Sequence, residues 1–281
     1  MPDIKHFRTQ IDDVDKQLLV LLNRRLELAQ EIGKIKNREG LPIYAPEREE
    51  QLLRSLIARS EGPLSERALR AIYREIMSAA LALEKNIIIA CYGETGNPSH
   101  QAAIQKFGSS VTYTFFHEME AAFTSVESDE AECVVVPIEY HDSGAVNVTL
   151  DALATTSLSI CAEIYLPLSI SKDSANDRFL VLGRKANPPS GEDLSILLLR
   201  IEDKPGSLVS ALEPFKDHEV NLSHFASRPA AKGSEDVFIF IEAGGHIEDT
   251  ATKELFRELS KRCRAVKALG SYPKLRTGEH R

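Results

Sequence analysis

The first 85 residues carry the spacing of apolar side chains that is typical of amphipathic helices. From residue 4 to residue 37 the apolar positions alternate at intervals of four and three residues, with no proline and only one glycine. This spacing predicts a single helix, roughly 50 Å long at ~1.5 Å per residue. The apolar positions are Phe7, Ile11, Val14, Leu18, Leu21, Leu28, Ile32 and Ile35.

Two shorter helices are predicted next, from Pro46 to about Ser60 and from Leu64 to about Lys85. Proline is favoured at the first helical position, and a Gly-Pro pair separates the two helices. Neither helix is long enough to cover the apolar seam of the first. Since an uncovered seam of this kind normally packs against another chain, we expect a homodimer or a dimer of dimers.

From residue 86 the pattern changes to short apolar runs bounded by turn residues. The runs NIIIACYG, VTYTFF, CVVVPI, SICAEIYLPL and RFLVLG, with a helix expected over 99–107, predict a small α/β unit with a partly parallel sheet. The joint NPPSGED then leads into strands and helices in the ferredoxin-like order βαββαβ. The predicted domains are helical over 1–85, α/β over 86–185 and ferredoxin-like over 192–275.

Composition narrows the possible function classes. The 281 residues suffice for two domains or three small ones, and no apolar run approaches the ~20 residues that cross a bilayer. The charged N-terminus is unlike a secretory signal, and four scattered cysteines favour neither a zinc site nor disulfides, so we expect a cytoplasmic protein without metal or cofactor. His224 and His246 are expected on the surface or in turns. The net charge of −8 does not favour nucleic-acid binding.

The excess negative charge is concentrated in the middle third of the chain. Residues 86–185 carry 5 basic and 13 acidic side chains, whereas residues 1–85 carry 15 and 14, and residues 186–281 carry 14 and 15. An anionic substrate is therefore least expected in the middle segment.

Charged side chains interrupt the apolar faces of the helices. Arg25 occupies a seam position where an apolar residue is expected, and Lys36 shares its face of the first helix. Glu84 lies on the apolar face of the third helix. Two interpretations remain open: Arg25 and Glu84 form a buried structural ion pair, or several cations, including Arg8 and Arg48, converge on a polyanion.

The same stretches resemble the all-helical chorismate mutase family. The similarity covers residues 1–85 and is carried by FRTQIDDVDKQLLVLLNRRLELAQEIGKIK, PIYAPEREEQLL and AIYREIMSAALALEK. The resemblance implies the following catalytic residues: Arg8 (reaching across the dimer), Arg25 and Arg48 for the substrate carboxylates, Lys36 and Glu84 for the ether oxygen, and Glu49 for the substrate hydroxyl.

The chemistry of that family suits such residues. The conversion of chorismate to prephenate is a pericyclic rearrangement, so the enzyme must hold a dicarboxylate in its compact conformer and stabilise negative charge growing on the ether oxygen. Glu84 can help only when it is protonated, and burial would raise its pKa. Ala45 and Ala80 replace the Asp and Ser common in the family, so we expect reduced activity, not its loss.

The middle segment resembles part of the prephenate dehydratase family. GETGNPSHQAAIQKFG, ECVVVPIEYHDSGAVNVTLDAL and NDRFLVLG carry the resemblance, but the segment is too short for the two lobes of that family. The family's Thr-Arg-Phe is Asp-Arg-Phe at 177–179, and its Glu-Asn-Ser is Glu-Tyr-His at 139–141. We therefore expect an inactive remnant that serves as a spacer or dimerisation platform, although Ser99, His100 and Glu139 match the family.

The last segment resembles the ACT regulatory domain attached to prephenate dehydratases, through PGSLVSALEPFKDHEVNLSHFASRP and LGSYP. The resemblance implies an L-phenylalanine site between paired ACT domains, where free amides at a helix start would meet the effector carboxylate. Alanine replaces the family's Glu at 226, which weakens this expectation, and a purely structural dimer contact is the alternative. The implied effector residues are Gly206, Ser207, Leu208, Val209, Ala226, Ser227, Arg228 and Pro229.

The leading hypothesis is a chorismate mutase of phenylalanine and tyrosine biosynthesis, with an inactive dehydratase remnant and a phenylalanine-sensing ACT domain. One alternative is a bifunctional chorismate mutase/prephenate dehydratase with a shortened dehydratase domain. Another is a non-catalytic, phenylalanine-binding regulator of a pathway enzyme. The retained cationic set favours a mutase over a regulator, because a regulator has little reason to keep a buried cationic cluster.

Overall fold

The computed structural model describes residues 3–84, 87–167, 176–230 and 234–275. It contains a helical region, a mixed α/β sheet and a separate antiparallel sheet, which confirms the predicted fold class. Within these residues, no helix is both long enough and apolar enough to cross a membrane. The exact domain boundaries stay a prediction.

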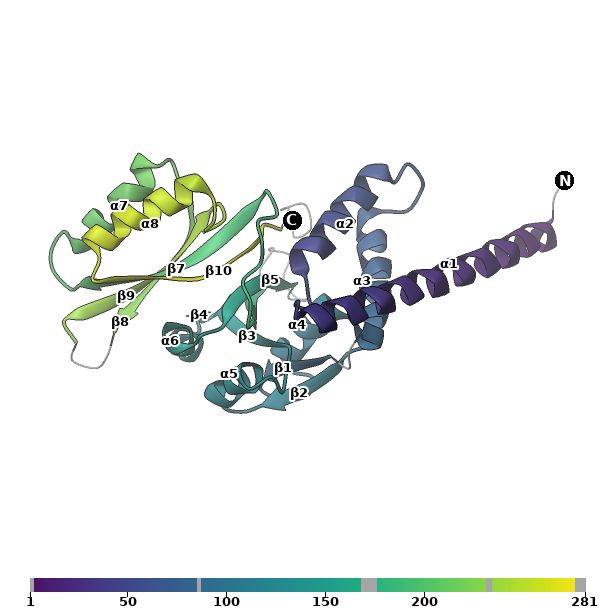
Figure 1. The fold of residues 1–281 in the computed structure, drawn as a ribbon, viewed down its shortest axis with the longest axis horizontal. Helices are drawn as coiled ribbons and strands as arrows, with labels where there is room; N and C mark the ends of the chain where they lie inside the picture. Colours follow the sequence, from purple (N-terminus) through teal and green to yellow (C-terminus); the bar gives the residue numbers. More distant parts are fainter. Residues whose placement is uncertain (1–2, 85–86, 168–175, 231–233, 276–281) are drawn as a thin grey trace.

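Three helices form the N-terminal region, as predicted: α1 (Ile4–Glu39), α2 (Pro46–Arg59) and α3 (Glu66–Glu84). Asp3 caps α1, because its carboxylate accepts a hydrogen bond from the backbone N–H of His6 at 2.9 Å. Gly40 ends α1 with a φ of 65°, which glycine adopts without strain. In Figure 1 the N-terminal half of α1 projects beyond the rest of the molecule.

The apolar seam of α1 is not covered by the part of its own chain that the structure describes. All eight seam residues are exposed, with Phe7 at 52% and Leu21 at 65%. Gly33 is the single buried residue of α1. An apolar stripe running along the whole helix marks an interaction surface, so one chain leaves open the face that the expected dimer would bury.

The α/β unit has a six-stranded sheet in the order β2-β1-β3-β6-β5, with β4 paired to β3. β1 runs parallel to β2 and β3, whereas β6 is antiparallel to β3 and β5, so the partly parallel sheet is confirmed. The strands are β1 (Ile88–Tyr92), β2 (Thr112–Phe116), β3 (Cys133–Tyr140), β4 (Gly144–Ala145), β5 (Ser159–Pro167) and β6 (Asn176–Gly183).

Three helices accompany this sheet. α4 (Pro98–Phe107) lies where a helix was predicted, and Asn97 caps it by accepting from the backbone N–H of His100 at 2.9 Å. α5 (Met119–Glu127) and α6 (Asn147–Thr155) were not predicted. Each has nine residues, which is too short for a helical period to stand out in the sequence.

The second sheet is antiparallel throughout, in the order β10-β7-β9-β8, and its ferredoxin-like element order is confirmed. Helices α7 and α8 cover one face (Figure 1). The other face shares a hydrophobic core with the α/β unit, and this core includes Ile196, Leu198 and Tyr272 together with Leu150 of α6. The elements are β7 (Asp193–Glu202), α7 (Ser207–Asp217), β8 (Leu222–Pro229), β9 (Asp236–Gly244), α8 (Thr250–Arg262) and β10 (Ala265–Pro273).

Candidate functional site

A close crossing of α1 and α3 builds the centre of the site. A Cβ atom on Gly33 of α1 would lie 2.7 Å from Cγ and 2.8 Å from Cβ of Glu84, the last residue of α3. Only glycine allows this approach. Because Arg25, Gly33 and Lys36 share a face of α1, the crossing directs Glu84 toward the same face as the two cations.

Glu84 is half-buried near two positive charges. Burial raises the pKa of Glu84. The positive charge of Lys36, and to a smaller extent that of Arg25, opposes this shift only in part. Among the described residues, its buried Oε2 has no hydrogen-bond partner. An unpartnered buried carboxylate oxygen is rare in a folded protein and calls for an explanation such as a ligand or a proton. It also counts against Arg25 and Glu84 forming a closed structural ion pair.

The loop between α1 and α2 contacts the same cations. Lys36 Nζ donates a hydrogen bond to the carbonyl oxygen of Ile43 at 2.8 Å. Burial raises the pKa of Glu47 at the start of α2, and Lys36 is the cation that opposes this shift. Lys36 is thus placed between the loop and the end of α3.

α2 carries the next two predicted residues. Arg48 is exposed on the surface of α2. The Glu49 side chain is only 15% exposed, and its Oε2 accepts a hydrogen bond from Nζ of Lys106 at 3.2 Å. Lys106 belongs to α4 of the α/β unit. No local pattern in the sequence indicates this contact, because it joins residues 57 positions apart.

Arg8 lies far from the other predicted residues of its own chain. It is exposed on α1 and precedes Lys36 by 28 residues, which corresponds to about 42 Å along a helix. A single chain therefore brings together Arg25, Lys36 and Glu84 but not Arg8. The role predicted for Arg8 requires a second copy of the chain.

A buried ion cluster joins the two sheets. Arg178 on β6 donates from Nε to Glu163 on β5 and from Nη2 to Glu242 on β9, both at 2.7 Å. Tyr272 on β10 also donates to Glu242 at 2.7 Å, and Glu139 approaches the guanidinium at 3.0 Å. Burial raises the pKa of Glu163 to about 7, although the Arg178 charge opposes the shift. The guanidinium is thus surrounded by carboxylates of the protein itself.

Asp177 and His100, in the dehydratase-like stretches, have local hydrogen-bond partners. Asp177 accepts a hydrogen bond from the backbone N–H of His141 at 3.1 Å. His100 Nδ1 accepts from the backbone N–H of Gly96 at 2.9 Å. Ser99 Oγ is buried and, within the described ranges, unpartnered. Acidic residues inside apolar strands, Glu163 and Glu242, were a sequence signal that could have indicated the cluster, and it was missed.

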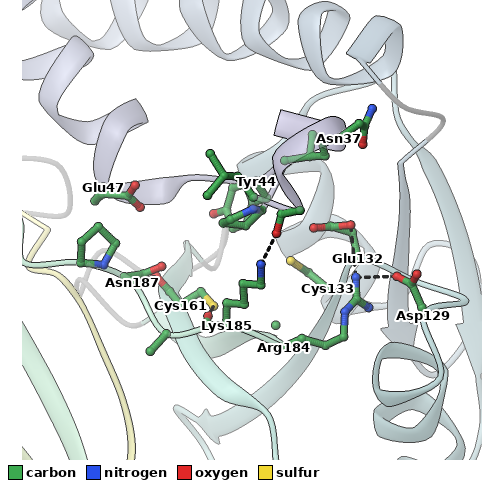
Figure 2. Close-up of a pocket in the computed structure, with 17 residues that line it drawn as sticks. Asn37, Tyr44, Glu47, Asp129, Glu132, Cys133, Cys161, Arg184, Lys185 and Asn187 are labelled. Atoms are coloured by element: carbon green, nitrogen blue, oxygen red, sulfur yellow. Dashed lines mark hydrogen bonds and ion pairs between the residues drawn. The ribbon is translucent and has the colours of Figure 1, made fainter. Parts of the chain in front are cut away.

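A cavity of about 270 Å³ lies between the α1–α2 loop and the α/β sheet (Figure 2). Tyr44, Glu47 and Cys161 line it, and Lys185 donates across it to the carbonyl oxygen of Gly40. Burial raises the pKa of Cys161 to about 12, so this thiol is protonated at neutral pH. The cavity therefore offers polar contacts but no activated nucleophile from this thiol.

The two predicted effector segments lie at the same end of the antiparallel sheet. Pro229 on β8 pairs with Val237 on β9, and Val237 pairs with Ile201 on β7. Gly206, with a φ of 87°, directly precedes α7. The segments are thus two strands apart at the end where α7 begins.

Arg228 is turned toward the α/β unit rather than toward α7. Its guanidinium donates to the carbonyl oxygen of Asn147 at 2.7 Å and to the carboxylate of Asp151 at 2.8 Å, both in α6. Ala226 is half-buried against the shared core, whereas Val209 is 66% exposed. Arg228 as observed is therefore engaged by the protein.

The two histidines were expected on the surface or in turns. His224 is exposed, and His246 begins a turn in which its carbonyl oxygen accepts from the backbone N–H of Asp249 at 3.0 Å, although His246 itself is only 2% exposed. The ring of His246 is held by the carbonyl oxygen of Asn187 at 3.0 Å and by the backbone N–H of Glu248 at 3.0 Å. No three His, Cys, Asp or Glu side chains in the described part of the chain are arranged to hold a metal ion.

Comparison with known proteins matches the first two of the three structural units to protein families. Residues 7–85 match the family chorismate mutase type II, and residues 89–172 match prephenate dehydratase. A bifunctional chorismate mutase/prephenate dehydratase of Aquifex aeolicus is 30% identical, over 98% of this chain and 99% of that protein. That alignment spans 357 positions against 281 residues here, so at least 76 positions, the difference between the two, have no counterpart in this chain.

Two solved structures share the fold of the sheets. A quorum-quenching acylase superposes with a TM-score of 0.61 at 24% identity, covering 69% of this chain and 98% of its own. A prephenate dehydratase from Arthrobacter aurescens, in complex with L-Phe, superposes with a TM-score of 0.59 at 21% identity, covering 67% and 90%. Because one fold hosts both names, these superpositions establish architecture and leave activity to the residues of the site.

The crossing at Gly33 predicts an unusual response to alanine. Helix propensity alone favours alanine over glycine by about 1 kcal/mol. Here the new Cβ would overlap Cβ and Cγ of Glu84, so we expect Gly33→Ala to lower the free energy of unfolding by about 1–2 kcal/mol. Urea unfolding at fixed protomer concentration measures this change. The exposed neighbour Lys34→Ala serves as the control and should stay within about 0.5 kcal/mol. A stabilised Gly33→Ala protein would disprove the close crossing.

Proposed function

The chain belongs to the family of bifunctional chorismate mutase/prephenate dehydratases, and we propose from this premise that its helical region converts chorismate to prephenate. The observation that carries the proposal is the grouping of Arg25, Lys36 and Glu84 at the α1–α3 crossing, with one buried carboxylate oxygen left unpartnered among the described residues. A site that is cationic and also holds a protonatable carboxylate suits a dianionic ether.

In the proposed mechanism the side chains hold the substrate and respond to its changing charge. Arg25 and Arg48, with Arg8 from a second copy, bind the two carboxylates and select the compact conformer. Lys36 and protonated Glu84 donate hydrogen bonds to the ether oxygen as its bond to carbon breaks and negative charge grows there. Glu49 accepts a hydrogen bond from the substrate hydroxyl.

The proposed dimer follows from the uncovered seam of α1. Pairing two such helices would bury the exposed apolar residues and bring Arg8 of one copy to the cations of the other, which one chain cannot do. Chorismate and prephenate are the substrates named for the family, and no nucleic acid or membrane partner is proposed.

Prephenate dehydratase activity is the second candidate function. The comparisons favour the bifunctional alternative over an inactive remnant, because the relative that spans 98% of this chain is named for both activities. This chain differs from that relative in length, since at least 76 aligned positions are missing. In addition, its Arg178 is already surrounded by Glu163 and Glu242 of its own chain.

An L-phenylalanine site on the antiparallel sheet is proposed for regulation. The Arthrobacter relative was solved with L-Phe, and Gly206 precedes a helix whose first amides can bind a carboxylate. Ser207, Leu208 and Val209 begin that helix. The second segment, Ala226 to Pro229, would come from a paired copy.

The dimeric site can be tested by complementation between inactive variants. Arg8→Ala and Arg25→Ala should each abolish mutase activity, measured as the decrease in chorismate absorbance, while the dimer stays folded. A heterodimer of the two has one site with both arginines, so an equimolar, fully exchanged mixture should regain about a quarter of wild-type activity. Arg24→Ala, on the neighbouring exposed position, is the control and should remain active. An inactive wild-type protein would disprove the mutase, and a mixture without recovery would disprove the shared site.

The protonation of Glu84 predicts the pH dependence of the mutase. Only the protonated carboxyl donates to the ether oxygen, and burial raises its pKa, so activity should be full below that pKa and fall as the pH rises through it. Glu84→Gln keeps a donor that does not titrate, and should flatten the profile of kcat/KM between pH 5 and about 9. Equal profiles for both proteins would contradict this role.

One further assay separates the functions of the sheets. Wild-type protein given chorismate, with and without L-phenylalanine, should form prephenate, and a dehydratase would convert that product to phenylpyruvate, which absorbs in alkali. We expect L-phenylalanine to alter the rate or raise the unfolding temperature, and Gly206→Val to abolish that response. Formation of phenylpyruvate would establish a bifunctional protein. If the protein forms no phenylpyruvate even when it is given authentic prephenate, the α/β unit is an inactive remnant.

A further inference from the structure

The loop between α1 and α2 is held by the α/β unit. Ile43 and Tyr44 are buried in the same hydrophobic cluster as Phe107 of α4 and Val135 of β3. The rings of Tyr44 and Phe107 have their centroids 4.9 Å apart. Since α2 starts two residues after Tyr44, the α/β unit fixes the start of the helix that carries Glu49.

Lys106 makes the direct contact between that unit and the mutase residues. Its side chain is 25% exposed, its Nζ donates to Glu49 Oε2 at 3.2 Å, and it lies 5.8 Å from the centroid of the Tyr44 ring. This hydrogen bond involves only Oε2 of the Glu49 carboxylate, and Oε1 takes no part in it. The ammonium also offsets the negative charge that Glu49 would present to a dianionic substrate.

The position of this lysine is itself fixed by contacts with α3. Gly108, which ends α4, has a φ of 73°, and a Cβ there would lie 2.7 Å from Cβ of Ser78. Ser109 then donates from its backbone N–H to Glu75 Oε2 at 3.1 Å. The end of α4 is therefore docked on α3, and the reach of its lysine to α2 is set by the fold.

We propose that Lys106 is a positioning residue of the mutase site, through which the α/β unit orients Glu49 toward the substrate hydroxyl. The inference rests on the proposed mutase function and on Glu49 as the hydroxyl ligand. It assigns to the α/β unit a role in the first reaction that is independent of any dehydratase activity. A carboxylate held through one oxygen keeps the other available to accept from a hydroxyl.

The test compares steady-state kinetics of the full-length chain and its variants on chorismate. Lys106→Met keeps the length of the side chain and removes the charge; it should raise KM about tenfold and change kcat less than about threefold, because binding of a hydroxyl is shared by ground and transition states. Lys106→Arg should restore most of the affinity. In a Glu49→Gln background, Lys106→Met should add less than about a twofold change, because the two residues act as one unit.

Gln105→Ala is the matched control, since it lies on the same helix and removes a bond to the Tyr165 carbonyl oxygen without touching α2. It should leave KM unchanged. Lys106→Gln replaces Lys106→Met if the latter unfolds, as judged by circular dichroism. An active wild type with unchanged KM in Lys106→Met, an effect independent of Glu49, or the same effect in Gln105→Ala would overturn the inference. An inactive wild type would instead overturn the proposed function.

Discussion

The uncovered apolar seam of α1 is the constraint on which the rest of this structure depends. The helix has 36 residues with exposed apolar side chains along its length, and the two shorter helices of the same chain are too short to cover this face. The same geometry separates Arg8 from Lys36 by about 42 Å. Burial of the seam and assembly of the cationic site therefore both require a second copy of the chain, which the proposed dimer supplies.

The three structural units are joined more closely than a chain of separate domains. Ile43 and Tyr44 bring the α1–α2 loop into the core of the α/β unit, and the two sheets share a second core that includes Tyr272. At that junction Arg178 links Glu163 of one sheet to Glu242 of the other. Part of the acidic excess of the middle segment thus pairs with Arg178 where the two sheets meet, and removal of either partner would leave a buried charge uncompensated.

Local patterns in the sequence predicted much of this fold. The alternating spacing of α1, the apolar runs of the strands and the βαββαβ order depend on neighbours in sequence, and each was confirmed. Features that depend on long-range contacts were missed. The Lys106–Glu49 bond spans 57 positions and the Arg178–Glu242 bond spans 64, so no local period reveals them. The burial of His246 was also missed, because its ring contacts the carbonyl oxygen of Asn187, 59 positions away in the sequence.

The shortened α/β unit still closes a continuous core, and this has consequences for regulation. Gly270 on β10 lies so close to β5 that a Cβ atom at this position would overlap the backbone of Ile160. The two sheets therefore meet directly. An effector on the antiparallel sheet can influence the mutase only if it binds two arrangements of the protein with different affinity. The junction supplies a physical connection, because Glu163 and Arg178 lie in the sheet against which α4 packs, and α4 carries the lysine that contacts Glu49. Because α2 also contacts the antiparallel sheet directly, through Arg54 Nη2 donating to the carbonyl oxygen of Lys274 at 3.3 Å, the α/β unit is one of two physical connections that the described residues make between that sheet and the helical region.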